Sequence, residues 1–178
     1  MSKLVAPHGG KGLVCALLEG ADRDAELQKA AGLKQVEISA RAKGDLIMMG
    51  IGGFSPLTGF MSKADWKGVC ENFQMADGTF WPVPITLDVS AADAADISEG
   101  DEIALVKDGE TYATMKVEEK YEMTDADKKW ECEKVFMGQG EESVDGKFWE
   151  IAPEDHPGVI MVQAQKEFNL AGPVKVLS

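Results

Sequence analysis

Ser55 is the residue whose neighbours come closest to a nucleophile motif in this sequence. Serine hydrolases hold their nucleophile in a Gly-x-Ser-x-Gly turn between a strand and a helix, and Ser55 follows Gly53 and Phe54 in a similar run. Leu57 stands where the second glycine belongs, and Pro56 lacks the backbone N–H that an oxyanion hole would use there. The run therefore argues against a nucleophilic role for Ser55.

Two glycine-rich stretches have some features of phosphate-binding loops. Gly50 and Gly52 have the first spacing of a dinucleotide fingerprint, but Ser55 takes the place of the third glycine, and a helix is predicted where the motif needs a strand. The stretch PHGGKG at residues 7–12 has a lysine among glycines, without the spacing of a P-loop or a preceding strand. We predict a flexible N-terminal arm there and a phosphate site in neither stretch.

The histidines and cysteines are too widely spaced to predict a metal site. His8 and His156 lie near opposite ends of the chain, without acidic or cysteine partners at ligand spacing. Pro157 follows His156, which favours a turn or the entry to a helix at this position. The cysteines contain no CxxC pair, are odd in number and indicate neither a zinc framework nor a disulfide scaffold. They are Cys15, Cys70 and Cys132.

The charge of the chain argues against an extended basic surface. It contains 31 acidic and 18 basic residues, with a net charge of −13, and its two arginines are Arg23 and Arg41. Because nucleic-acid affinity comes largely from basic patches, we predict no nucleic-acid binding. The N-terminal residues have no signal-peptide pattern and no apolar window reaches the length of a membrane span, so we expect a cytoplasmic protein.

Caps and apolar spacing predict several helices. A serine or threonine that can accept a hydrogen bond from the first turn precedes three of them. In one, Trp66, Val69 and Phe73 are expected on the same face. The predicted helices cover residues 22–32, 39–49, 62–73 and 124–136, and another begins at Pro157.

Asp108 and Gly109 give the clearest β signal, because they separate two alternating runs in the way that a two-residue hairpin turn requires. The second arm of this hairpin is predicted over residues 111–121. We also predict extended strands at 79–90 and 167–178, a short buried strand or turn at 13–20, and an exposed acidic insertion at 138–155. These elements predict an α+β domain built on a small, mostly antiparallel sheet or barrel. The length of 178 residues is enough for one domain with its own core.

The apolar, glycine-rich run from residue 50 to residue 66 has two interpretations. Phe54, Leu57 and Phe60 could fill a buried corner between two helices, with glycines allowing tight turns. The same residues could form the wall of a pocket. The sequence leaves both interpretations open.

Four motifs in order give the chain a recognisable pattern. They are PHGG at residues 7–10, GGFSPLTGFM at 52–61, DGTFWPVPITLDV at 77–89, and HPGV at 156–159 followed by LAGPVKV at 170–176. In this the chain resembles the N-terminal domain of the ATP sulfurylase (sulfate adenylyltransferase) family, and the motifs cover nearly its whole length.

The resemblance implies a fold and a reaction. The family's N-terminal domain is a PUA-like small β-barrel with flanking helices, and a catalytic Rossmann-like domain follows it. These nucleotidyltransferases join ATP and sulfate, with Mg²⁺, to give adenosine 5′-phosphosulfate (APS) and pyrophosphate, or run in reverse. The resemblance does not distinguish sulfate assimilation, sulfate reduction and ATP synthesis. It also implies a homo-oligomer without membrane contact.

The catalytic signatures of that family, Q-x-R-N-P-x-H-x-x-H and G-R-D-H, do not occur in this sequence. We therefore assign no catalytic residue, metal ligand or bound cofactor to residues 1–178. We expect these residues alone to be inactive, and we expect ATP and sulfate to bind through the catalytic domain. The alternative is a stand-alone PUA-like module that binds RNA or builds assemblies. The candidate cleft-wall or interdomain residues are Phe54, Ser55, Pro56, Leu57, Gly59 and Phe60, and the candidate structural motif is His156, Pro157 and Gly158.

Overall fold

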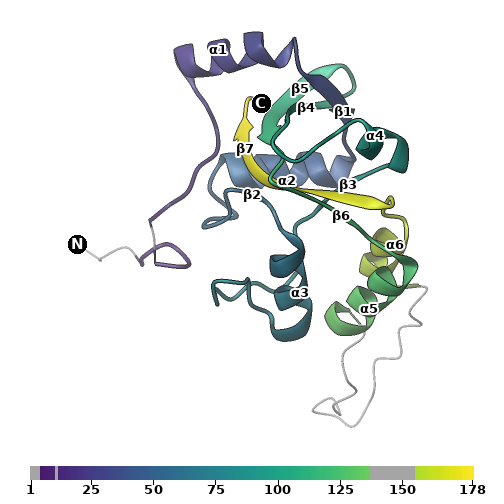
Figure 1. Ribbon diagram of the computed structural model, residues 1–178. Coiled ribbons are helices and arrows are strands. Elements are labelled where there is room, and N and C mark those ends of the chain that lie inside the picture. Colours follow the sequence, from purple (N-terminus) through teal and green to yellow (C-terminus); the bar gives the residue numbers. More distant parts are fainter. Residues whose placement is uncertain (1–4, 11, 137–154) are drawn as a thin grey trace.

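A curled sheet dominates the computed structural model, which describes residues 5–10, 12–136 and 155–178 (Figure 1). Within this described part the sheet has seven strands, in the order β1-β4-β5-β7-β2, with β3 and β6 also paired to β7. The pair β1–β4 is parallel and the other pairs are antiparallel, as the prediction of a mostly antiparallel sheet requires. The strands are β1 (Lys34–Glu37), β2 (Gly59–Phe60), β3 (Leu87–Val89), β4 (Glu102–Lys107), β5 (Glu110–Lys116), β6 (Glu119–Glu122) and β7 (Phe168–Val176).

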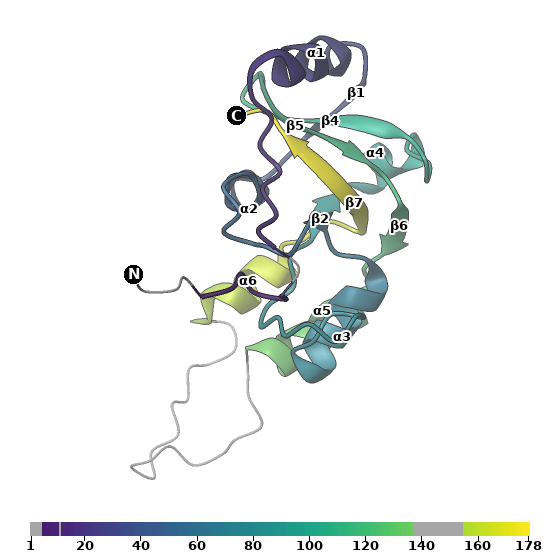
Figure 2. The ribbon, with the colours of Figure 1, turned by 90° about the vertical axis from the view of Figure 1, so that its left-hand side faces the viewer.

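Strand β7 organises the sheet because it has partners along its whole length. Its first half pairs with β3 and β6, and its second half pairs with β5 and β2. The predicted hairpin is confirmed: β4 and β5 meet at Asp108 and Gly109, whose φ angles of 53° and 80° fit a tight two-residue turn. The sheet therefore curls around one central strand (Figure 2).

The predicted helices are confirmed within a few residues at their ends. Serine or threonine side chains cap four helices by accepting from a backbone N–H in the first turn, as expected at Ser39, Ser62 and Thr124. Thr124 also completes a capping box with Asp127. The helices are α1 (Gly20–Ala30), α2 (Ala40–Gly50), α3 (Lys63–Asn72), α4 (Ala91–Ala95), α5 (Asp125–Val135) and α6 (Pro157–Gln163).

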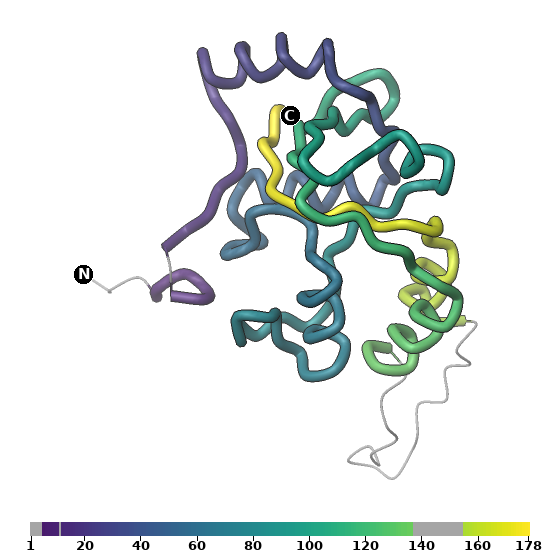
Figure 3. Tube along the Cα trace, viewed as in Figure 1, coloured from purple at the N-terminus to yellow at the C-terminus, as the bar shows by residue number. Residues whose placement is uncertain are grey.

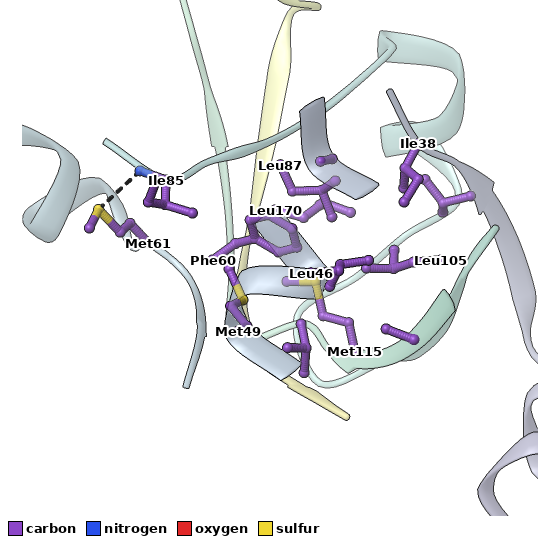
Figure 4. Packing of buried hydrophobic residues seen from close by; sticks show 14 of the residues in the cluster. Ile38, Leu46, Met49, Phe60, Met61, Ile85, Leu87, Leu105, Met115 and Leu170 are labelled. Atoms are coloured by element: carbon purple, nitrogen blue, oxygen red, sulfur yellow. Dashed lines mark hydrogen bonds between the residues drawn. The ribbon is translucent and has the colours of Figure 1, made fainter. Parts of the chain in front are cut away.

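The main core lies between α2 and the concave side of the sheet (Figure 4). Leu46 and Met49 from α2 meet Leu105, Met115 and Leu170 from the strands, and all five are fully buried. Helices α3, α5 and α6 form a separate group on the other side of β6 and the first half of β7 (Figure 1). The domain thus consists of the curled sheet with α2 and a helical lobe attached to it.

Four sequence predictions need correction. Residues 13–19 lie outside helices and strands and are largely exposed, with a bridge from Leu17 to Val176, because they lie along the outside of α2, and Gly20 already begins α1. Phe73 is not on the buried face of its helix but caps it with φ 55°, 44% exposed. Of the strand expected at 79–90 only Leu87–Val89 joins the sheet, and the arm expected at 111–121 is split between β5 and β6. The predicted acidic insertion at 138–155 lies almost entirely outside the described residues.

Candidate functional site

The corner that follows α2 is held by its own backbone and by the N-terminal segment. The Phe54 amide donates to the Met48 carbonyl at 3.3 Å, and the Leu57 amide donates to the Phe54 carbonyl at 2.8 Å. The Ser55 hydroxyl accepts from the Val14 amide at 3.0 Å. Ser55 is buried and its hydroxyl fastens the neighbouring segment, which agrees with the argument against a nucleophile.

The first motif, PHGG, packs against this corner. His8 Nε2 lies 2.7 Å from the Phe80 carbonyl oxygen, and the His8 ring contacts Trp81 at a centroid distance of 6.2 Å. A β-carbon added to Gly9 would come within 2.9 Å of Pro56. The prediction of a flexible arm is therefore wrong at His8 and Gly9, because both contact residues far along the chain.

A close strand crossing follows the corner. β2 pairs with β7 so that Phe60 lies opposite Gly172, and Gly59 lies opposite Pro173. A β-carbon on Gly59 would overlap the carbonyl oxygen of Gly172, and one on Gly172 would overlap the carbonyl oxygen of Lys116. Gly172 also has φ 143°, which L side chains rarely adopt. Glycines of two motifs far apart in sequence are thus required by neighbouring backbone contacts, Gly59 against Gly172 and Gly172 against Lys116.

A cleft of about 500 Å³ opens beside this crossing. Its walls come from residues 56–62, the loop at 75–77, residues 118–119 and residues 171–173, together with Asp65 of α3. Four of the six candidate cleft-wall residues line it, and these are Pro56, Leu57, Gly59 and Phe60. Phe54 and Ser55 do not line it: Phe54 lies edge-on against Trp81 at 5.8 Å, and Ser55 faces the N-terminal segment. The corner is therefore both a buried junction and, over its second half, one side of a cleft.

The cleft is acidic. Its lining includes Asp65, Asp77, Glu118 and Glu119, and none of the described residues that line it is Lys, Arg or His. Three of these carboxylates have structural bonds. Asp65 accepts from the Ala76 amide at 2.9 Å, Asp77 accepts from the Thr79 amide at 3.0 Å, and Glu119 accepts from the Lys63 amide at 3.0 Å. A polyanion would be repelled here, so the cleft by itself does not suit ATP or sulfate.

Two buried hydrogen bonds lie behind the cleft. The Tyr121 hydroxyl donates to the Met61 carbonyl at 3.1 Å, and the Trp66 indole donates to the Glu131 carboxyl at 2.7 Å. Burial raises the pKa of Glu131 above the ordinary value, although the Trp66 bond opposes this. The first bond fixes Met61 of the cleft lining to β6, and the second fixes α3, whose Asp65 lines the cleft, to α5.

Sequence reasoning missed half of the cleft. Glu118, Glu119 and the stretch 171–173 reach it only through the pairing of β6, β7 and β2, and no spacing in the sequence points to this. The stretch 171–173 did belong to a family motif, LAGPVKV, which was the available signal.

The candidate structural motif at residues 156–158 lies away from the cleft. His156 is the N-cap of α6, with Nδ1 accepting from the Gly158 amide at 3.1 Å, and Pro157 is the first helical residue. A β-carbon on Gly158 would overlap the Phe136 ring, so close packing on the end of α5 requires glycine there. The predicted helix entry is confirmed.

The described residues contain no group of three or more His, Cys, Asp and Glu side chains that could hold a metal ion. Among the described helices, none has the length and apolarity to cross a membrane.

Comparison with known proteins finds similarity over the whole chain. The model of a family described as PUA-like domain matches residues 5–178. The chain is 74% identical over 178 residues to a sulfate adenylyltransferase of Desulfovibrio desulfuricans, and 51% identical to one of Thiobacillus denitrificans. Each alignment covers 100% of this chain but 42% and 40% of the relative, so the chain spans less than half the length of these curated relatives.

A solved structure also resembles the fold. A hexameric APS kinase from Thiobacillus denitrificans has a TM-score of 0.66 and 25% sequence identity, over 98% of this chain and 27% of that chain.

Proposed function

The chain belongs to the family of PUA-like domains, and we propose that it is the N-terminal domain of a sulfate adenylyltransferase. The observation that carries this proposal is the 74% identity over the full 178 residues to a protein of that name, of which the chain makes up 42%. We call the protein of the relatives' length the longer protein. In it, a catalytic Rossmann-like domain follows residue 178.

In the proposed reaction, sulfate attacks the α-phosphate of ATP and gives APS and pyrophosphate, or the reverse occurs. ATP enters as its Mg²⁺ complex, and the domain described here binds neither. The reason is electrostatic: the reaction brings two polyanions together and needs positioned cations and N–H donors, whereas the cleft has four carboxylates and the chain a net charge of −13. The 178 residues alone would be inactive.

The cleft has a supporting role in this proposal. Pro56, Leu57, Gly59 and Phe60 form one side of the space that the catalytic domain closes, and the buried bonds behind it keep that side rigid. The longer protein would act in the cytoplasm in sulfate assimilation or reduction, as a homo-oligomer. The hexameric solved relative supports the last point.

The acidic surface weighs against the RNA-binding alternative, because it would repel a phosphate backbone.

The test measures APS and pyrophosphate formation from ATP, Mg²⁺ and sulfate by the longer protein and by residues 1–178 alone. We expect turnover in the first and background in the second. In the longer protein, Thr58→Trp would fill the cleft from an exposed position, and we expect a roughly tenfold loss of kcat/KM with an unchanged melting temperature.

Ala64→Trp is the matched control, because Ala64 is exposed on α3 and does not line the cleft. Absence of APS from the longer protein would overturn the proposed enzyme. Equal kcat/KM for the two tryptophan variants would overturn only the role of the cleft.

A further inference from the structure

A patch of exposed apolar side chains lies on the side of α2 that faces away from the core. It combines two segments, the extended stretch before α1 and the end of α2, and we call it the apolar patch. Exposed fractions run from 37% for Met48 to 63% for Leu13. Its members are Leu13, Leu17, Ile47, Met48 and Ile51.

Backbone bonds make the patch one surface. The Ala16 amide donates to the Met49 carbonyl at 3.0 Å, and the Leu17 amide donates to the Gly50 carbonyl at 3.3 Å. These bonds lay the extended stretch along the end of α2, as the tube in Figure 3 also shows. A shallow groove of about 550 Å³ runs between Leu17 and Ile51.

The ends of the groove differ in chemistry. Cys15 lies in the groove with an exposed thiol, among apolar neighbours. At the other end, Glu19 and Asp22 line it with exposed carboxylates. A complementary segment would therefore present apolar side chains to Leu17 and Ile51 and basic side chains to the two carboxylates.

Val176, near the end of the sequence, lies beside this patch. Val176 pairs with Leu17, and the Leu18 amide donates to the Val176 carbonyl at 2.9 Å. A β-carbon on Gly50 would touch Val176 at 3.1 Å. A polypeptide that continues past Ser178 therefore leaves the domain two residues after the contact of Val176 with Leu17, and in Figure 2 the end marked C lies near α1.

We propose that the apolar patch is the docking face for the polypeptide that follows Ser178 in the longer protein, an apolar segment bordered by basic side chains. The inference rests on the proposed function, which places further chain after residue 178, and on the length of the relatives, of which this chain covers 42%. The patch is a different surface from the cleft. Docking at the patch would therefore not cover the cleft, which remains available to face the catalytic site.

Cys15 is a built-in reporter for this interface, because it lies in the groove while Cys70 and Cys132 are buried. The experiment labels the native, longer protein with a thiol reagent and follows Cys15 by peptide mass. The reference is the variant Ile160→Cys, whose new thiol replaces a side chain 51% exposed on α6. We expect Cys15 to react about tenfold more slowly than the reference thiol, since it must wait for the interface to open.

A second variant keeps the test decisive. Ile51→Asp places a charge in the proposed interface, and we expect it to speed the labelling of Cys15 in the longer protein by about tenfold. Ile160→Asp is the matched control, and we expect it to leave the Cys15 rate unchanged. Equal rates for Cys15 and the reference thiol would overturn the proposal, as would an Ile51→Asp variant that labels like the control.

Dilution distinguishes a patch covered by the same polypeptide from a patch covered by a second copy. Protection of Cys15 that is independent of protein concentration supports docking within one chain. Protection that disappears on dilution means that a second copy covers the patch, which would overturn the assigned occupant.

The result is also independent of the enzyme assay. A longer protein that makes APS but leaves Cys15 reactive refutes only the docking face. One that protects Cys15 without making APS refutes the proposed function and leaves the docking face standing.

Discussion

Gly59 and Gly172 cross so closely that a β-carbon on Gly59 would overlap the carbonyl oxygen of Gly172. The contact joins β2 to the middle of β7, and both residues belong to the lining of the cleft. The neighbouring atoms are backbone, which cannot move aside as the end of a flexible side chain can. The crossing therefore fixes where the cleft begins.

Gly59→Ala is expected to destabilise the 178-residue domain by about 3 kcal/mol or more, because β2 and β7 would have to separate. Gly44→Ala is the matched control. Gly44 lies inside α2 with nothing within 4 Å of an added β-carbon, so alanine should stabilise the domain by about 1 kcal/mol. Urea denaturation measures the free energy of unfolding of both variants. A Gly59→Ala variant as stable as the unchanged domain would contradict the close contact between β2 and β7.

Ser55→Ala is expected to lower the free energy of unfolding by about 1–2 kcal/mol, because the part-buried Val14 amide loses its acceptor. Turnover of the longer protein should stay the same, since the hydroxyl holds the N-terminal segment and does no chemistry. Steady-state kinetics beside a melting curve checks this. Loss of turnover by orders of magnitude without a loss of stability would revive the nucleophile hypothesis.

Phe54→Ala should reduce stability by about 2–3 kcal/mol, because the half-buried ring packs edge-on against Trp81 and joins the main core. Phe54 does not line the cleft, so kcat and KM of the folded longer protein should not change. Phe54→Leu, which keeps most of the apolar volume, should recover much of the melting temperature. A fall in turnover with an unchanged melting temperature would instead assign Phe54 to the functional surface.

Glu26 fastens α1 to the sheet and should make stability depend on pH. It is 8% exposed and accepts hydrogen bonds from Lys175 at 2.9 Å and Thr114 at 2.7 Å, with Lys29 at 3.3 Å. Burial would raise the pKa of this carboxyl, but the three hydrogen bonds outweigh it and lower the pKa from 4.5 to about 2. A depressed pKa contributes stability above the unfolded value, and this contribution is lost as the pH falls towards the folded value.

Glu26→Gln should therefore cost about 2–3 kcal/mol at pH 7 and much less near pH 2. Denaturant unfolding of both proteins between pH 7 and pH 2 measures the difference. Glu122→Gln, an exposed residue of β6, should give a small and nearly constant difference. A cost for Glu26→Gln that does not shrink between pH 4.5 and pH 2 would contradict the role of the ionised carboxyl.

The local elements of this fold were predictable because their signals are local. A cap such as Thr124 bonds to a backbone amide three residues on, and the turn at Asp108 needs only the two runs beside it. The segment at 13–20 was predicted to be buried from its apolar composition. The segment is exposed because no layer of the described residues covers this side of α2. Amino-acid composition alone does not predict which sides of a helix are covered.

The candidate site was predictable only in part, because only some of its signals are local. The glycine-rich corner pointed to a junction, but which of its residues face the cleft depends on the direction in which the chain leaves each turn. Phe54 and Ser55 face Trp81 and Val14, whereas Leu57 and Phe60 reach the cleft. Neighbours in sequence thus serve different surfaces.

By itself the sequence determined the helix caps, the hairpin, the lack of the family's catalytic signatures and the four motifs that identify the family. Only the tertiary structure decided that β7 brings residues 171–173 against residues 56–61, that four carboxylates gather in one cleft, and that Val176 lies beside the apolar patch. The physical reason is range: caps and turns are set by hydrogen bonds within a few residues, whereas the cleft and the patch depend on strand pairing between segments more than a hundred residues apart.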